Sequence, residues 1–232
     1  MSLQDRITEV EERLSRACQR SGRNRDDVAV IAVTKYVSLE TTRAVVASGY
    51  KRIGENRWQD VEPKWEALSN EQHDVEWHFI GHLQTNKVKD VIGKFAYIHS
   101  LDRLSLAKEI NKRASGMENK IKCLIQLNIS GEDSKYGLNP DELFSFAEQV
   151  REYPAIEICG LMTMAPFESE PEQTRPVFRR LRELRDELNE RAILDKPVTE
   201  LSMGMSNDFE VAVEEGATWV RLGSLLVGKE SL

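Results

Sequence analysis

Short runs of β-branched residues alternate with longer amphipathic runs along the chain, and this alternation restricts its fold more than any other feature. The short runs predict buried parallel strands, and the longer runs predict helices. Strands are expected at residues 28–34, 52–54, 77–80, 97–100, 122–128, 157–162, 200–202 and 219–222. Such an alternation is typical of a single (β/α)8 TIM barrel of the α/β class, and an open doubly wound sheet is the alternative.

The helices are expected between these strands. Ser38 is a candidate cap for a helix that runs to residue 47, and Asn56 begins a helix that has to accommodate Pro63. The others are expected at 85–92, 104–114, 142–152, 171–192 and 207–214, with an extra N-terminal helix that ends near Gly22. No linker rich in Pro, Gly or Ser divides the chain, and about ten residues follow the last strand. We therefore expect one domain, residues 1–232, with no second β domain.

Charge and cysteine content exclude several classes of protein. The net charge of −7 argues against nucleic acid or an anionic membrane as the main partner. The N-terminus lacks the apolar core of a signal peptide, and no run approaches the ~20 apolar residues of a membrane helix. Cys18, Cys123 and Cys159 are widely spaced, so we expect neither disulfides nor a metal site. Cys123 and Cys159 are expected in the core, and the protein in the cytoplasm.

Lys35 is the first candidate site residue. It ends the apolar run VAVIAVTK, and the carboxyl ends of barrel strands form the active-site face. An amine held there on a rigid strand is suited to attack an aldehyde. The alternative is a lysine that has simply reached solvent at the end of a strand.

Two segments have the composition of phosphate-binding turns. Ser202, Gly204 and Ser206 lie where the seventh strand gives way to a helix, and Gly223 and Ser224 follow the eighth strand. Hydroxyl groups, close backbone approach at glycine and free N–H groups at a helix start all suit a phosphate. Barrels often bind phosphate with these two loops. A serine cap with a tight glycine turn is the alternative for the first segment.

Four other residues are candidates with competing interpretations. Arg221 precedes the second glycine turn in an apolar run, which favours an inward polar role over a surface position. Asn56 follows the second strand and is also a possible helix cap. His78 lies in an apolar strand, where a hydrogen-bonded core histidine is commoner than a catalytic one. Met162 ends the sixth strand and suits the core or the floor beneath a flat ring.

Several segments together resemble one family. They are AVTKYV, IGENRWQD, EWHFIGHLQTNK, LIQLNISGEDSKYG, GLMTM and LSMGMSNDFEVAVEEGATWVRLGSLLVG. In this order they are similar to the pyridoxal phosphate homeostasis proteins, also called the YggS/PROSC family, over nearly the whole chain. The resemblance implies the fold of the barrel domain of alanine racemase, without that enzyme's second, β-rich domain.

The resemblance also implies the cofactor and its contacts. Pyridoxal 5′-phosphate would form a Schiff base with Lys35, and Arg221 would face its pyridine nitrogen. The phosphate would contact the two segments described above, through Ser202, Gly204, Ser206, Gly223 and Ser224. Ser224 stands where many members carry threonine, and its hydroxyl preserves the expected contact. Asn56 and His78 match motif positions of the family.

An arginine at the pyridine nitrogen favours a role in cofactor homeostasis without efficient catalysis. Arginine cannot accept a proton and so leaves the ring a weak electron sink. Alanine racemases take a second acid–base tyrosine from the β-rich domain, and none of the five tyrosines here lies in an obvious replacement segment. A low-activity racemase or lyase is the alternative, and a phosphosugar enzyme is a weaker one. We expect a monomer that binds pyridoxal phosphate and also reacts with free amino acids.

Overall fold

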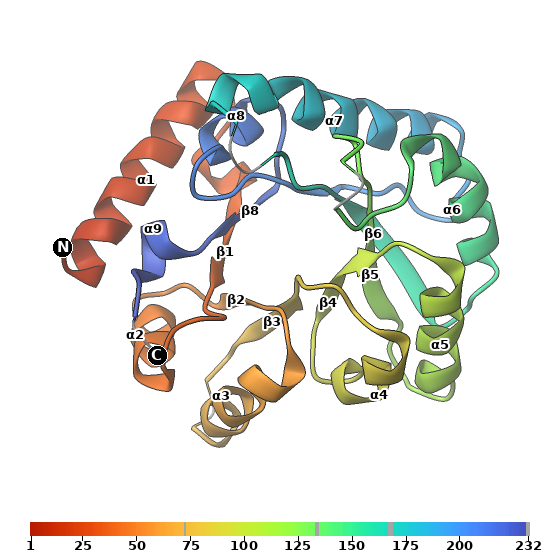
Figure 1. Cartoon of the computed structure of the whole chain (residues 1–232), viewed down its shortest axis with the longest axis horizontal. Helices are drawn as coiled ribbons and strands as arrows, with labels where there is room; N and C mark the ends of the chain where they lie inside the picture. Colours follow the sequence, from red (N-terminus) through yellow and green to blue (C-terminus); the bar gives the residue numbers. More distant parts are fainter. Residues whose placement is uncertain (72, 133–134, 167–168, 231–232) are drawn as a thin grey trace.

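The computed structural model describes residues 1–71, 73–132, 135–166 and 169–230. Its parallel strands form a closed barrel in chain order, β1-β2-β3-β4-β5-β6-β7-β8 (Figure 1). Their bounds are β1 Ala29–Val33, β2 Arg52–Glu55, β3 Glu76–Phe79, β4 Tyr97–Leu101, β5 Ile121–Gln126, β6 Ile156–Met162, β7 Glu200–Ser202 and β8 Trp219–Leu222. The eight expected strands are confirmed to within two residues at each end. Because β1 pairs with β8, the open doubly wound sheet is excluded.

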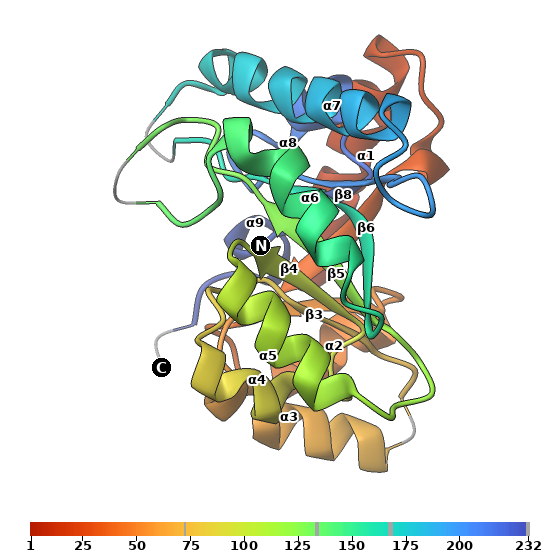
Figure 2. The ribbon, with the colours of Figure 1, turned by 90° about the vertical axis from the view of Figure 1, so that its right-hand side faces the viewer.

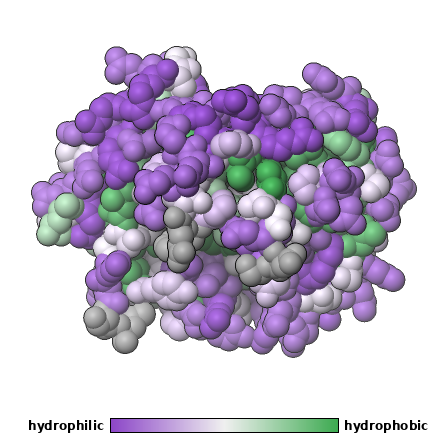
Figure 3. Space-filling view, turned by 45° about the horizontal axis from the view of Figure 1, so that its top comes forward, coloured by the Kyte–Doolittle hydropathy of each residue, from purple (hydrophilic) through white to green (hydrophobic). Residues whose placement is uncertain are grey.

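The helices surround the barrel. They are α1 Leu3–Arg20, α2 Leu39–Ala47, α3 Trp58–Asn70, α4 Val88–Val91, α5 Leu104–Ala114, α6 Leu143–Arg151, α7 Arg175–Glu190, α8 Phe209–Glu214 and α9 Ser224–Val227. Figure 2 shows α3 and α4 at one side of the barrel and α7 at the opposite side. No helix in the described ranges is long and apolar enough to cross a membrane. Hydrophilic side chains cover most of the face in Figure 3, with hydrophobic ones visible between them.

Most helix ends agree with the sequence to within two residues. Ser38 caps α2 as expected, through a hydrogen bond from the Thr41 amide. Asn56 does not begin α3, because Arg57 is its N-cap residue. The helices expected at 85–92 and 171–192 each start with a 3₁₀ turn, Thr85–Lys87 and Pro171–Thr174. Such turns are common at helix termini.

The extra helix α1 supports the last helix of the chain. The Arg6 guanidinium donates to the carbonyl oxygens of Leu226, at 2.9 Å, and Val227, at 3.2 Å. These carbonyls end α9 and have no partner within the helix. A cation near a helix C-terminus is also favourable electrostatically. The contact holds α9 at the carboxyl end of the barrel, where β8 ends.

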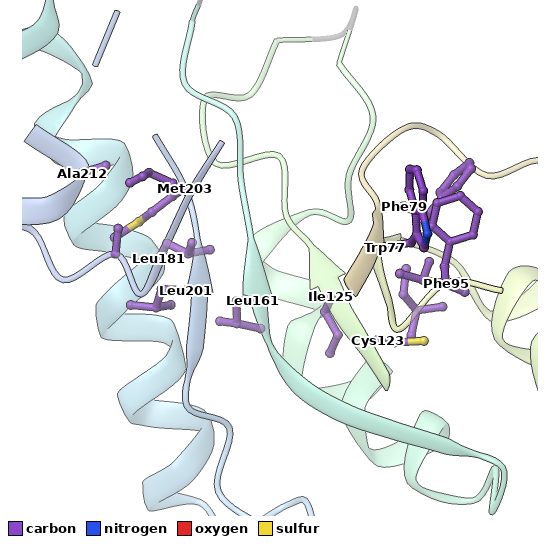
Figure 4. Close-up of a cluster of buried hydrophobic side chains, with 14 of the residues drawn as sticks. Trp77, Phe79, Phe95, Cys123, Ile125, Leu161, Leu181, Leu201, Met203 and Ala212 are labelled. Atoms are coloured by element: carbon purple, nitrogen blue, oxygen red, sulfur yellow. The ribbon is translucent and has the colours of Figure 1, made fainter. Parts of the chain in front are cut away.

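The core has two parts. The larger part lies between strands and helices, and Figure 4 shows Leu181 of α7 beside Leu201 of β7, with Trp77, Phe79 and Phe95 grouped at the other side. The smaller part comprises Ile31, Leu124, Met162 and Trp219, whose strands face one another across the barrel. The interior of such a barrel is therefore a packed core and not a pore.

The cysteine thiols are all free, as expected. Cys18 and Cys123 are buried, whereas Cys159 is only partly buried. The expectation that Cys159 is a core residue is therefore wrong. It lies on β6 between Ile158 and Gly160, which are buried. Because side chains alternate along a strand, Cys159 shares the other face of β6 with Glu157.

A buried ion pair joins the ends of β1 and β2 to α3. The Glu55 carboxylate accepts hydrogen bonds from Thr34 Oγ1, at 2.7 Å, and from Lys64 Nζ, at 3.0 Å. Lys64 Nζ also donates to the Thr34 carbonyl oxygen, at 2.7 Å. All three residues are buried. Because Thr34 directly precedes Lys35, this cluster fixes the point at which β1 ends.

The pair makes stability depend on pH. Burial raises the pKa of Glu55, and the charge of Lys64 opposes that rise. The folded chain therefore keeps a proton on this carboxyl at a pH where the unfolded chain has lost it. The stabilising contribution is complete below the unfolded pKa and is lost as the pH rises through the folded pKa. Removing Lys64 raises the folded pKa further and deepens this loss.

We expect Lys64→Met to lower the free energy of unfolding by about 3–5 kcal/mol at about pH 8, and by clearly less at about pH 5. Urea denaturation at the two pH values measures both effects. Lys51→Met is the control, because the Lys51–Asp74 pair is exposed, and we expect a change within about 0.5 kcal/mol. An equal loss at both pH values would show that Glu55 is not the group involved.

Candidate functional site

A cavity of about 870 Å³ opens at the carboxyl ends of the strands. Its walls come from the carboxyl ends of β1, β2, β3, β5, β6, β7 and β8 and the segments that follow them, including the segment 227–230. Six residues singled out in the sequence line it: Lys35, Asn56, Ser206, Arg221, Gly223 and Ser224. Lys35 and Ser224 are 189 positions apart in the sequence. Closure of the barrel brings them to the same cavity.

The other four candidates lie behind this wall. His78 and Ser202 are buried and are hydrogen-bonded within the barrel, and Met162 packs in the smaller core. Gly204 has a φ of 91°, and an added Cβ there would lie 2.6 Å from the Cβ of Ala212. Gly204 thus lets the loop after β7 pack closely on α8. None of the four is among the lining residues.

Lys35 lies two residues after the end of β1 and is partly buried. Its Nζ lies 4.8 Å from the centroid of the exposed Tyr36 ring. The residue after next, Val37, is buried, and Ser38 caps α2, so both sides of the lysine are anchored. The amine is held on a short, fixed segment at the cavity wall.

Ser206, Gly223 and Ser224 line the same cavity and follow the neighbouring strands β7 and β8. Ser224 begins α9, so the first N–H groups of that helix have no helical acceptor. The loop that carries Ser206 is fixed by the Asp208 carboxylate, which accepts from the Met205 amide at 2.7 Å. Hydroxyl and N–H donors on the wall of one cavity are suited to an anion with several oxygens.

Arg221 lies at the cavity floor and is 4% exposed. Its Nη1 donates to Ser202 Oγ at 2.7 Å, and its Nη2 donates to the Thr163 carbonyl oxygen at 3.0 Å. Burial lowers the pKa of Arg221 to about 10, against a smaller opposing effect of Asp208. The guanidinium is therefore still charged at neutral pH, and it cannot serve as a proton acceptor there.

Sequence reasoning missed several wall residues, including two aromatic ones. The rings of His82 and Tyr136 stack with centroids 3.8 Å apart, and both line the cavity, as does Tyr36. No tyrosine lies in an obvious replacement segment of the sequence, yet the structure places Tyr36 and Tyr136 on the cavity wall. His82 and Tyr136 follow different strands, so no spacing in the sequence could have paired them. Within the described residues, no group of acidic, histidine and cysteine side chains is arranged to hold a metal.

Known proteins share this fold and much of this sequence. The family model for the alanine racemase N-terminal domain matches residues 7–231. A pyridoxal phosphate homeostasis protein of Aquifex aeolicus is 47% identical over 229 residues, which are 99% of each chain. The structure of PipY from Synechococcus elongatus PCC7942 with PLP bound is 34% identical, with a TM-score of 0.81 and coverage of 94% of this chain and 100% of PipY.

Alanine racemase itself shares the fold alone. The Clostridium difficile enzyme is 14% identical, with a TM-score of 0.74, and the match covers 97% of this chain and 56% of the enzyme. By contrast, the identity to the Aquifex protein extends over essentially the full length of both chains. The chain therefore belongs to the family of pyridoxal phosphate homeostasis proteins, which carry the alanine racemase N-terminal domain.

Proposed function

We propose that this protein binds pyridoxal 5′-phosphate covalently through Lys35 and takes part in the homeostasis of that cofactor. One observation carries the proposal: a lysine and residues with hydroxyl and N–H groups suited to a phosphate line the same cavity. The similarity to PipY, solved with PLP bound, supports it. The names of the homeostasis proteins support the wider role.

The residues present fit the cofactor chemically. The cofactor supplies an aldehyde, a phosphate and a pyridine ring that withdraws electrons. The Lys35 amine can condense with the aldehyde carbon, so that a C=N bond forms and one water leaves. Ser206, Gly223 and Ser224 would hold the phosphate across the cavity. Asn56 follows β2 and lines the cavity. Its Oδ1 is buried and accepts no hydrogen bond from the described residues.

The four candidates behind the wall have indirect roles in this proposal. Ser202 holds Arg221, and His78 belongs to the same hydrogen-bonded row inside the barrel. Met162 packs in the smaller core beneath the site, and Gly204 allows the tight loop that carries Ser206. We place Arg221 opposite the pyridine nitrogen, where its charge would keep that nitrogen unprotonated.

Inefficient catalysis is part of the proposal. An unprotonated ring stabilises a carbanion weakly, so proton removal from a bound amino acid is slow. Tyr136 is the observation that favours the alternative, a slow racemase or lyase, because its ring lies on the cavity wall. Tyr136 is 56% exposed, however, and an efficient acid–base site usually excludes water. We also propose that the protein acts in the cytoplasm as a monomer and that free amino acids react at this site.

Lys35→Ala is expected to abolish the visible absorption band of the loaded protein, because the C=N bond needs this amine. Lys51→Ala, at the opposite end of β2, should keep the band. Borohydride reduction followed by peptide mass mapping should place the cofactor on Lys35. Modification mainly of Lys229, which also lines the cavity, would refute the assignment.

The double variant Ser206→Ala, Ser224→Ala is expected to weaken retention of pyridoxal phosphate about tenfold or more, because charge-assisted hydrogen bonds to the phosphate are lost. Equilibrium dialysis at fixed ionic strength measures the affinity. Affinity for pyridoxal, which lacks the phosphate, should hardly change and is the matched control. If the variant binds pyridoxal phosphate as tightly as the parent, the phosphate lies elsewhere.

Loaded protein in deuterated water should exchange the α-proton of alanine, serine and glutamate slowly, far below the ~10 s⁻¹ typical of enzymes. Spectral shifts on adding amino acids are nevertheless expected, because amines react at the C=N carbon without losing the α-proton. Proton NMR follows the exchange, and Tyr136→Phe should leave its rate unchanged. Rapid exchange with inversion that Tyr136→Phe slows would establish the racemase alternative.

A further inference from the structure

Polar side chains form a continuous row through the middle of the barrel, from its amino end to the cavity floor. Glu76 Oε1 lies 2.9 Å from His78 Nε2, and His78 Nδ1 lies 2.9 Å from His99 Nε2. His99 Nδ1 lies 2.9 Å from Ser202 Oγ, which accepts from Arg221 Nη1 at 2.7 Å. We call these five residues the interior row. It joins β3, β4, β7 and β8.

The two ends of the interior row have fixed hydrogen-bonding roles. Hydrogen bonding from His78 lowers the pKa of Glu76, so this carboxylate is ionised at neutral pH and can only accept. The guanidinium of Arg221 can only donate. The hydrogen bonds between them must therefore run in one direction, from Arg221 towards Glu76.

This direction determines the tautomers of both histidines. His78 donates from Nε2 to Glu76, so its Nδ1 carries no proton and accepts from His99 Nε2. His99 Nδ1 then accepts the Ser202 hydroxyl proton. Each neutral ring has one donor and one acceptor, and each is used. Both ring nitrogens of each histidine and the Ser202 hydroxyl thus have a partner within the described chain.

The opposite direction is unfavourable. If His99 donated to Ser202, the hydroxyl proton of Ser202 would have no acceptor among the hydrogen bonds of the described chain. His78 would also have to be charged to donate at both ring nitrogens. Burial lowers the pKa of His78 and lowers that of His99 well below the usual range. Charging either ring inside the barrel is therefore costly.

We infer that the interior row is a positioning device for Arg221. Glu76, His78 and His99 fix the rotation of the Ser202 hydroxyl, so that its oxygen lone pair faces the guanidinium. Ser202 and the Thr163 carbonyl hold two of the five N–H groups of Arg221, and the plane of the group is thereby set relative to the cavity. Ser202 and the two histidines are positioning residues. The inference rests on the proposed function only where it concerns the cofactor.

The first test needs no cofactor. Protein labelled with ¹⁵N-histidine at pH 7 should show His78 and His99 as neutral rings protonated at Nε2. The chain has four histidines. The His73→Gln and His82→Gln variants identify the signals of His73 and His82, so that the remaining signals belong to His78 and His99. A proton on Nδ1 of His99, or a charged ring at either position, would overturn the inference.

The second test asks whether Ser202 acts through Arg221. Ser202→Ala is expected to raise the dissociation constant for pyridoxal phosphate about threefold to tenfold. In an Arg221→Lys background the same substitution should add less than about twofold, because coupled residues are not additive. Ser100→Ala is the matched control: Ser100 is buried beside His99 on β4, and its hydroxyl has no partner within the described residues.

The outcomes separate the two proposals. Equal effects of Ser202→Ala in both backgrounds, or an equal effect of Ser100→Ala, would contradict the positioning role. Failure of the parent protein to bind pyridoxal phosphate would contradict the proposed function, and the histidine tautomers would still decide whether the interior row exists. Melting temperatures identify variants that fail to fold. If the Ser202→Ala variant fails to fold, the histidine tautomers of the parent protein alone decide whether the inference holds.

Discussion

The parallel pairing of β1 with β8 is the constraint on which the rest of the structure depends. Its register places Ile31 opposite Arg221 and Ala32 opposite Leu222. The segments that leave these two strands therefore start side by side, one with Lys35 and the other with Gly223 and Ser224. Without this pairing the sheet would remain open, and Lys35 would lie at the opposite edge from Gly223 and Ser224.

The polar interior is the second constraint. Burying a charged arginine and two histidines inside a barrel is unfavourable unless each finds partners. Here a single row of hydrogen bonds supplies them, and it runs from a carboxylate near the amino end to the cavity floor. The smaller hydrophobic core packs around it, with His78 and Trp219 in edge contact at 5.1 Å between ring centroids. A network of this kind specifies one arrangement of the site more strictly than apolar packing does.

The site combines features of a binding protein with the fold of an enzyme. Arg221 at its floor remains charged, and the aromatic residues at its rim, Tyr36 and Tyr136, are exposed. A wall open to solvent suits loading and release of a ligand more than control of a reactive intermediate. In the proposed function, a covalent bond to Lys35 and the hydroxyl and N–H donors near the ends of β7 and β8 would retain the cofactor, and they would do so independently of any acid–base chemistry.

The sequence by itself determined the eight strands, most helices and six residues of the cavity wall. The reason is that strand periodicity, caps and glycine turns are local signals, and strand ends in a barrel share one face. The first residues of the helices were less well determined by the sequence. Asn56 was expected to begin α3, but the next residue, Arg57, is its N-cap. The resemblance to the family added the roles that we propose for Lys35 and Arg221.

Only the tertiary structure decided which polar residues meet. His99 and Ser202 are 103 positions apart and Arg221 and Thr163 are 58 apart, and nothing in their spacing reveals contact. The same holds for the Tyr136 ring on His82 and for Ser202, which contacts Arg221 and not the cavity. These contacts follow from the closure and register of the barrel, which fix side-chain neighbours across strands that are distant in the chain. The local sequence fixes only which residues lie on each strand.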